Sequence, residues 1–430
     1  MNIRLTHARV LTMAGSPSDG AGTVTDGEVW VRGNRITHVG PAPEKEPADR
    51  WDRVIDLDGN LVMPGFKNAH THSAMTFLRS YADDLPLQEW LTRQVFPMEA
   101  KLTADRVYHL TRLAILEYLT SGITANFDMY FFPEAVAKAA VDCGFRTVMC
   151  GSINNFTGSV RQLEEDFRRF NGYHELVGYR LGFHAEYTTS RPILDGIAEL
   201  AHRCRAPVYT HNSETKREVA ECIERNGATP TVWLSRLGLF DFGGGGFHCV
   251  HMTPEDMEIF RRDKLWAITN PGSNCKLASG IAPLQAMRER GIPMAIGTDG
   301  PASNNGLDMF REMYLTACLQ KIREEDAAAM DAGLVLRMAA ANGADAMGLP
   351  ECDALLPGKL ADLIVVDLHQ PNMQPLNDIA KNIVYSGSKQ NVKLTMINGR
   401  ILYEDGQFSV GADPEEIYAK ANEIIAEMKK

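Results

Sequence analysis

The middle of the chain alternates short apolar runs with longer segments in which apolar residues recur at the spacing of an α-helix. The runs are rich in β-branched and small residues, as buried parallel strands are, so the alternation predicts repeated β-α units. Eight such units can close into a barrel, and we therefore expect a (β/α)8 barrel of the TIM type. The predicted strands lie within residues 61–72, 122–130, 145–153, 179–187, 206–214, 245–252, 265–274 and 293–300.

An open, doubly wound sheet is the alternative arrangement of such units. It would need a glycine-rich phosphate-binding loop after its first strand. Residues 70–77, which follow the first run, read HTHSAMTF and contain no glycine. The barrel is therefore favoured, with helices expected within residues 102–122, 161–175, 190–204, 253–263 and 282–291.

The two ends of the chain have a different pattern, in which short β-rich segments are separated by Gly and Asp turns. We expect residues 1–60 and 351–415 to join into one composite β-sandwich beside the barrel. The barrel itself is expected over residues 61–350. A charged segment of helical pattern then predicts a C-terminal helix over residues 416–430.

Composition and charge exclude several classes of protein. The 430 residues are 44% hydrophobic and 23% charged, as in ordinary globular proteins, and the net charge of -11 comes without any basic block. Such a balance argues against nucleic-acid binding. The N-terminus lacks a secretory pattern and no window could span a bilayer, so a cytoplasmic protein without a membrane partner is expected. Eight scattered cysteines without a C-x-x-C pair suggest neither disulfides nor a thiolate zinc site.

Candidate metal ligands fall at the ends of predicted strands, where a barrel places its reacting groups. His70 and His72 are two residues apart on an extended segment, so both imidazoles project to one side. His211 ends the fifth run and Asp299 the eighth. Taken singly, His211 fits a core histidine and Asp299 a turn residue. Their joint placement favours three histidines and one carboxylate that bind zinc or a similar ion.

Other polar residues near these strand ends are candidates for catalysis. The fourth run contains no lysine that could bridge two metal ions, so one metal ion is expected. His184, at the end of that run, is expected to contact the substrate. Glu214 lies three residues after His211 and is the natural proton shuttle, although a solvated glutamate is the alternative. His248 could orient the attacking water, whereas His251 is expected to be structural.

The segments PGFKNAHTH, VYTHNSE, HCVH, NPGSNCKLASGIAP and GTDGPASNN together resemble the amidohydrolase superfamily, in particular its 5'-methylthioadenosine/S-adenosylhomocysteine deaminases. The likeness runs from about residue 3 to residue 405. It implies one divalent ion, most often Zn2+ although Fe, Mn or Ni would fit the same ligands. It also implies the following roles: His70, His72, His211 and Asp299 as ligands, Glu214, His248 and Asp299 as proton carriers, and His184 as a contact of the purine or ribose.

The resemblance extends to substrate recognition. Residues 83–102 are similar to the family's substrate loop, in which Glu99 would grip ribose hydroxyls and Trp90 would line the pocket. From the residues alone, Trp90 could equally anchor a lid and Glu99 could begin a helix. Family members that accept the homocysteine carboxylate of S-adenosylhomocysteine carry two arginines. Here Cys150 stands at the first of these positions, while Arg161 could supply the second. A lost charged hydrogen bond costs about 1.5–3 kcal/mol, so a neutral 5' group is expected to be preferred.

The sequence thus predicts a metal-dependent deaminase that converts 5'-methylthioadenosine, 5'-deoxyadenosine, adenosine or S-adenosylhomocysteine to the inosine analogue and ammonia. One alternative keeps the site but changes the substrate to another aminated or halogenated heterocycle, such as a guanine, pterin or triazine. Another is a catalytically silent barrel, which the complete ligand set disfavours. A homo-oligomer is an expectation from the family alone.

Overall fold

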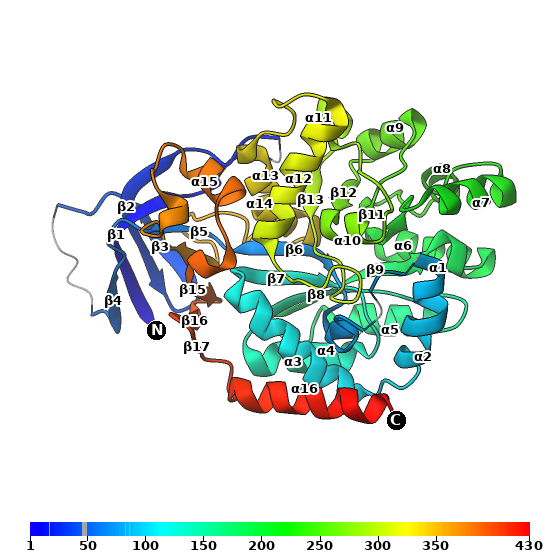
Figure 1. Cartoon of the computed structure of the whole chain (residues 1–430), viewed down its shortest axis with the longest axis horizontal. Coiled ribbons are helices and arrows are strands. Elements are labelled where there is room, and N and C mark those ends of the chain that lie inside the picture. The colour runs from blue at the N-terminus through cyan, green and yellow to red at the C-terminus, as the bar shows by residue number, and fades with distance from the viewer. Residues whose placement is uncertain (17, 45–49, 82, 86) are drawn as a thin grey trace.

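The computed structural model describes the whole chain except residues 17, 45–49, 82 and 86. Its centre is a sheet of eight parallel strands in which each strand pairs with the next along the chain (Figure 1). Each of the eight predicted runs overlaps one of these strands. They are β6 (Phe66–Thr71), β7 (Ile123–Asp128), β8 (Arg146–Cys150), β9 (Val177–Ala185), β10 (Val208–Asn212), β11 (Gly244–His248), β12 (Trp266–Thr269) and β13 (Met294–Ile296).

The first and last strands come together to close the barrel. The Asp299 backbone N–H donates to the His70 carbonyl over 2.9 Å. Below that bond, the Asn68 side chain accepts from the Thr298 backbone over 2.9 Å and donates to its hydroxyl over 2.7 Å. Closure therefore brings the end of β6, with its histidines, beside Asp299.

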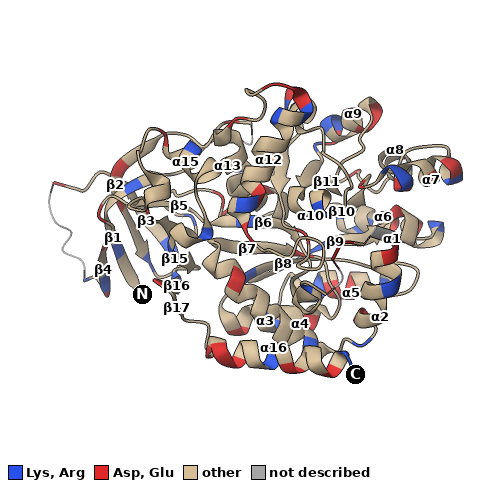
Figure 2. Ribbon diagram, viewed as in Figure 1, with Lys and Arg blue, Asp and Glu red and all other residues tan. Residues whose placement is uncertain are grey.

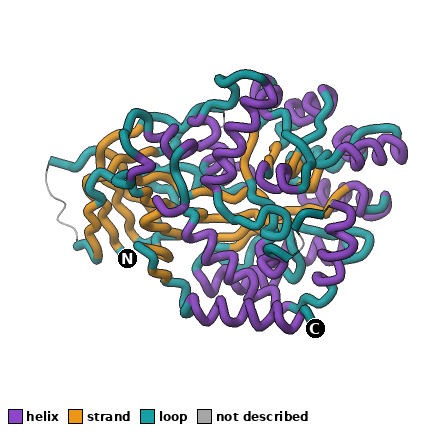
Figure 3. The backbone as a smooth tube through the Cα atoms, in the orientation of Figure 1, coloured by secondary structure: helices purple, strands orange, loops and turns teal. Residues whose placement is uncertain are grey.

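Helices surround the barrel, as the purple segments of Figure 3 show. The expected helices are confirmed, with ends shifted by a few residues where a capping side chain sets the boundary: Thr103, for example, accepts from the Arg106 N–H and begins the first long helix. The helices are α3 (Ala104–Thr120), α4 (Pro133–Cys143), α5 (Val160–Phe170), α6 (Arg191–Cys204), α7 (Lys216–Asn226), α8 (Pro230–Arg236), α9 (Pro254–Arg262), α10 (Pro271–Lys276), α11 (Leu284–Glu289), α12 (Met309–Glu324), α13 (Ala332–Ala339) and α14 (Ala341–Met347).

Both ends of the chain contribute to a second β domain, which confirms the predicted fold class. Nine strands form one hydrogen-bonded sheet in the order β17-β16-β15-β14-β5-β1-β2-β3, with β4 paired to β1. An apolar core of its own lies within this domain and includes Leu5, Val31 and Met396. The strands are β1 (Asn2–Leu11), β2 (Val24–Arg32), β3 (Arg35–Gly40), β4 (Arg53–Asp56), β5 (Leu61–Pro64), β14 (Leu363–Val366), β15 (Val392–Ile397), β16 (Arg400–Glu404) and β17 (Gln407–Phe408).

The two domains are joined through β5, which pairs with β1 and β14 although it lies in the same predicted run as the barrel strand β6. Arg146 on β8 also donates two hydrogen bonds to the Asp362 carboxylate, at 2.6 and 3.0 Å. Both side chains are buried. The divisions at residues 60 and 351 remain our proposal for the domain limits.

The C-terminal helix α16 (Pro414–Met428) packs along α3 (Figure 1). α15 (Ile379–Tyr385) packs against α12 and α13. Acidic and basic residues are interspersed along helices such as α5 and α16 (Figure 2). Within the described part of the chain, the structure has no helix of the length and apolar character that crossing a membrane requires.

Candidate metal centre and active site

The predicted ligands meet at the carboxyl ends of the barrel strands. One ligand atom from each of His70, His211, His248 and Asp299 lies within 4.8 Å of the others, and all four side chains are buried. His72 belongs to the same group, because its Nε2 lies 3.2 Å from Asp299 Oδ1. His248 Nε2 is farther from that carboxylate, at 4.0 Å from Oδ2. The mutually close group thus includes His248, which the sequence did not predict as a ligand, while the role of His72 as the third histidine ligand stays a prediction.

Hydrogen bonds fix how three of these imidazoles point. His211 Nδ1 lies 2.7 Å from the His184 carbonyl, and His72 Nδ1 contacts the Met129 carbonyl. His248 Nδ1 lies 2.8 Å from Asn274 Oδ1. A carbonyl or amide oxygen accepts only, so each Nδ1 carries a proton and each Nε2 faces the cluster.

His70 is the innermost residue of the cluster. Its ring is fully buried and stacks on Phe247 with centroids 3.8 Å apart. Among the residues that the structure describes, neither ring nitrogen has a hydrogen-bond partner. A buried polar atom without a partner is costly, and a cation would satisfy it. The donor set, three imidazoles and one carboxylate, is one that zinc and similar divalent ions accept.

The protonation states of His70, His211 and Asp299 also suit a metal. Burial lowers the pKa of His70 to about 3 and that of His211 well below its usual value, so both are neutral near pH 7. Burial also disfavours charge on His72, but the hydrogen bond and negative charge of Asp299 outweigh it and raise the pKa of His72. Burial opposes ionisation of Asp299, yet the adjacent imidazoles of His70 and His72 hold the pKa of Asp299 well below its usual value. Neutral imidazoles and an ionised carboxylate are the forms that bind metals.

The two oxygens of Asp299 have different surroundings. Oδ1 faces His70 and His72 and accepts from the Gly300 N–H over 2.7 Å. Oδ2 accepts from the hydroxyls of Ser273 and Ser303, at 2.6 and 2.8 Å. One oxygen is thus directed to the cluster while the other is held by two serines.

The backbone at this centre is strained at two functional positions. His248 has φ 70° and Asp299 has φ 61°, values in the left-handed region that non-glycine residues seldom adopt. Such residues cost about 1–3 kcal/mol each and persist where the surroundings hold them. The folded barrel therefore fixes both side chains in directions that an unstrained turn would not give.

Glu214 lies beside the cluster in the loop after β10. One carboxylate oxygen, Oε2, is 3.9 Å from His248 Nε2, and the other accepts from the Ser279 hydroxyl over 3.1 Å. The buried Glu218 accepts from the Glu214 backbone N–H over 2.7 Å and so holds this loop. His251 Nε2 lies 2.8 Å from the Ser279 carbonyl, and its structural role stays a prediction.

His184 ends β9 next to the metal ligands. Its ring centroid is 4.9 Å from that of His211, and its Nδ1 is 2.9 Å from the Thr188 hydroxyl. Burial lowers the pKa of His184 to about 4, so the imidazole is neutral. The side chain is only partly buried, which leaves it accessible to a ligand.

A short helical segment after β6 contacts the barrel through the Glu99–Tyr130 hydrogen bond; we call its described residues, 79–81, 83–85 and 87–102, the lid. It contains α1 (Leu87–Trp90), the π turn η2 (Leu91–Val95) and α2 (Phe96–Glu99), and follows the 3-10 helix η1 (Ser73–Leu78). Trp90 is buried, at 6% exposure. Glu99 is partly buried and accepts a 2.8 Å hydrogen bond from the Tyr130 hydroxyl. Burial raises the pKa of Glu99 to about 7, against the opposing effect of the Tyr130 bond.

The structure does not bring Cys150 and Arg161 to the cluster. Cys150 is buried in an apolar group inside the barrel that includes Phe127 and Tyr209. The Arg161 side chain is 89% exposed and pairs with Glu165, one turn along α5. A carboxylate clamp at these two positions therefore gains no support from their placement.

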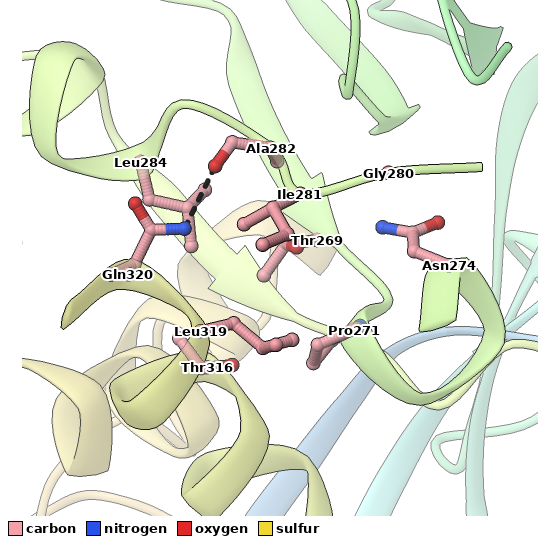
Figure 4. A pocket seen from close by; sticks show the side chains of 10 residues that line it. All are labelled: Thr269, Pro271, Asn274, Gly280, Ile281, Ala282, Leu284, Thr316, Leu319 and Gln320. Atoms are coloured by element: carbon pink, nitrogen blue, oxygen red, sulfur yellow. Dashed lines mark hydrogen bonds between the residues drawn. The ribbon is translucent and has the colours of Figure 1, made fainter. Parts of the chain in front are cut away.

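Several polar residues of the centre were not predicted, namely Tyr130, Asn274, Ser273, Ser279 and Ser303. Four of them lie in NPGSNCKLASG and GTDGPASNN, segments in which only Asp299 was a predicted site residue. Asn274 also lines the cavity drawn in Figure 4, between β12 and α12. That cavity holds about 10 Å³, room for roughly one water and far below a nucleoside.

Comparison with known proteins agrees with this geometry. The amidohydrolase family model matches residues 61–402. A 5-methylthioadenosine/S-adenosylhomocysteine deaminase of Caldanaerobacter subterraneus is 40% identical over 91% of each chain. The Syntrophomonas wolfei protein of that name is 38% identical over 100% of this chain and 99% of its own.

Solved structures show the same fold. The zinc-bound crystal structure of an adenosine deaminase from Xanthomonas campestris superposes with a TM-score of 0.91 at 30% identity, covering 100% of this chain and 98% of the other. Zinc-bound atrazine chlorohydrolase from Arthrobacter aurescens has a TM-score of 0.88 at 22% identity over 98% and 100% of the chains, which shows the fold alone. The chain is a hydrolase of carbon–nitrogen bonds that belongs to the amidohydrolase family and, within it, to the 5-methylthioadenosine/S-adenosylhomocysteine deaminases.

Proposed function

We propose that this chain removes the 6-amino group of adenosine-type nucleosides by hydrolysis, which yields the inosine analogue and ammonia. The observation that carries the proposal is the buried group of three histidines and Asp299 with Glu214 beside it. The names of the relatives point to the same substrate class, 5'-methylthioadenosine, S-adenosylhomocysteine and adenosine.

His70, His72, His211 and Asp299 would hold the divalent ion. When bound there, the ion supplies a water whose pKa falls from 15.7 towards about 7. The other residues then need only aim that water and move protons. Asp299 Oδ2, held by Ser273 and Ser303, is placed to accept a proton from the water. His248 Nε2 faces both Asp299 and Glu214, where it can orient the water between them.

Glu214 would deliver a proton to the ring nitrogen next to the amino-bearing carbon. Addition of water to that carbon places electrons on this nitrogen, so the proton stabilises the tetrahedral intermediate. Asp299 then returns a proton to the amino group, which leaves as ammonia. As the C6 carbonyl forms, the proton of the added hydroxyl passes back to Glu214, so one water is consumed and both carboxyl groups regain their starting forms.

Three residues would bind the nucleoside. Glu99 on the lid would accept hydrogen bonds from ribose hydroxyls, Trp90 would line the pocket, and His184 would contact the purine or ribose. In support, Glu99 and His184 are both only partly buried and lie close to the cluster. Arg161 remains the candidate for the 5' substituent, although its exposure gives it the weakest support.

An ammonia-release assay on the zinc-loaded protein tests the proposal. The substrates are adenosine, 5'-deoxyadenosine, 5'-methylthioadenosine and S-adenosylhomocysteine, with guanine and cytosine as free bases. We expect activity on the nucleosides and a preference for a neutral 5' group. Activity confined to free bases would overturn the nucleoside assignment and favour a deaminase of another heterocycle.

A further inference from the structure

Tyr130 connects the lid to the barrel and has no part in the proposed reaction. Tyr130 lies two residues after the end of β7 and is 7% exposed. Its hydroxyl donates to Glu99 Oε1 over 2.8 Å, and its ring centroid is 6.1 Å from that of His72. The tyrosine thus stands between a metal ligand and the lid carboxylate.

The two oxygens of Glu99 are not equivalent. Oε1 is occupied by the Tyr130 hydroxyl. Oε2 has no hydrogen-bond partner among the described residues, yet it is not among the side-chain atoms closed off from solvent. A carboxylate held by one oxygen and open at the other is arranged to accept from neighbouring hydroxyls of a ligand.

Other contacts already secure the two ends of the lid. At its start, Lys276 donates to Asp83 and Asn305, each over 2.5 Å, and Asn305 donates to Asp83 over 3.0 Å. At its end, Lys101 donates to the Met428 carbonyl. The Tyr130 bond is therefore not needed to keep the segment on the barrel, and its effect falls on the direction of the Glu99 side chain.

We infer that Tyr130 is a specificity-determining positioning residue, whose hydroxyl turns Glu99 so that its second oxygen accepts from the vicinal hydroxyls of a ribose. The inference rests on the proposed function, because it assigns the selection of ribonucleosides over deoxynucleosides to this pair. Without the hydroxyl, Glu99 regains its side-chain rotamers and must lose that freedom again when ribose binds.

Tyr130→Phe removes the hydroxyl and keeps the ring, so it is the direct test. On zinc-loaded enzyme we expect the KM for adenosine to rise about tenfold, the effect of one charge-assisted hydrogen bond, with kcat nearly unchanged. With 2',3'-dideoxyadenosine, which lacks both vicinal hydroxyls, the wild type and the variant should have the same KM.

Two further variants isolate the effect. Tyr108→Phe is the matched control, because the Tyr108 hydroxyl also donates to a carboxylate, that of Asp142, over 2.7 Å but on the outer helices. It should leave both substrates unaffected. Glu99→Ala should raise the adenosine KM further, and adding Tyr130→Phe to it should change nothing more, because the two residues act as one unit.

The outcomes separate the inference from the proposed function. An equal loss on adenosine and the dideoxynucleoside, or a fall in kcat alone, would show that Tyr130 supports the lid or the metal ligands and would overturn the inference. Wild-type kinetics in Tyr130→Phe would also overturn it. A wild-type enzyme that neither deaminates adenosine nor binds inosine by calorimetry would instead overturn the proposed function. If Tyr130→Phe lowers the thermal unfolding temperature strongly, Glu99→Gln is measured on the same two substrates instead. An equal rise in KM for both substrates in Glu99→Gln would overturn the inference.

Discussion

The metal cluster and the lid differ in how their side chains are held. In the cluster, the imidazoles of His72, His211 and His248 each bond through Nδ1 to a fixed acceptor, and Asp299 Oδ2 accepts from two serines. On the lid, the Glu99 carboxylate accepts one side-chain hydrogen bond among the described residues, from the Tyr130 hydroxyl. The proposed function therefore assigns the reaction to the firmly held strand ends and the selection of substrate to a few contacts of the lid. Mutations in the first region should abolish turnover, and those in the second should change which substrate is used.

Removing a cluster ligand should have the largest effect. His70→Asn takes away the imidazole whose nitrogens have no protein partner, so the zinc content should fall and turnover should drop by at least about 10³-fold. Zinc stabilises only the folded wild type, so its melting temperature should rise with added zinc while that of the variant stays constant. Metal analysis and calorimetry measure both effects.

His202→Asn is the control for that substitution, because His202 is half-exposed on α6 and pairs with Asp241. It should keep wild-type zinc and activity. Full zinc occupancy in His70→Asn would remove His70 from the ligand set.

Glu214→Gln separates catalysis from metal binding inside the cluster. The amide keeps the shape and the Ser279 contact but cannot carry the proton, so zinc should be retained while kcat falls about 10² to 10⁴-fold. Glu221→Gln, on the exposed face of α7, should behave as wild type. Normal turnover in the Glu214 variant would leave the proton shuttle to Asp299 or His248.

Ser279→Ala should weaken the same residue indirectly. Glu214 would lose the hydroxyl that holds Oε1, and we expect kcat to fall about tenfold with KM little changed, the effect of one lost hydrogen bond. Ser190→Ala, where the hydroxyl makes no capping bond to its helix, is the control. A change in KM alone would mean that Ser279 serves the substrate rather than Glu214.

The sequence predicted the metal cluster better than the lid. His70, His72, His211 and Asp299 could be found because strand ends in a barrel converge, so local pattern and residue type sufficed. Tyr130 and Ser279 carry no such signal, because they act through loops whose contacts depend on the folded chain. Cys150 is a position where the resemblance was a poor guide. The resemblance places a substrate-binding arginine there, but the Cys150 side chain packs into the barrel interior.

The pH dependence of substrate binding should show the effect of the lid directly. Burial raises the pKa of Glu99 to about 7, so below pH 7 the carboxylate becomes neutral and a poorer acceptor for ribose hydroxyls. The KM for adenosine should therefore rise as the pH falls from 8 to 6, by about tenfold at the lower limit where Glu99 is mostly protonated. In Glu99→Gln this titration should disappear while the steps that depend on Glu214 and the metal keep their own pH profile in kcat. If the KM of the variant follows pH as that of the wild type does, the titrating group lies in the cluster, and substrate binding is then controlled by the metal cluster as well.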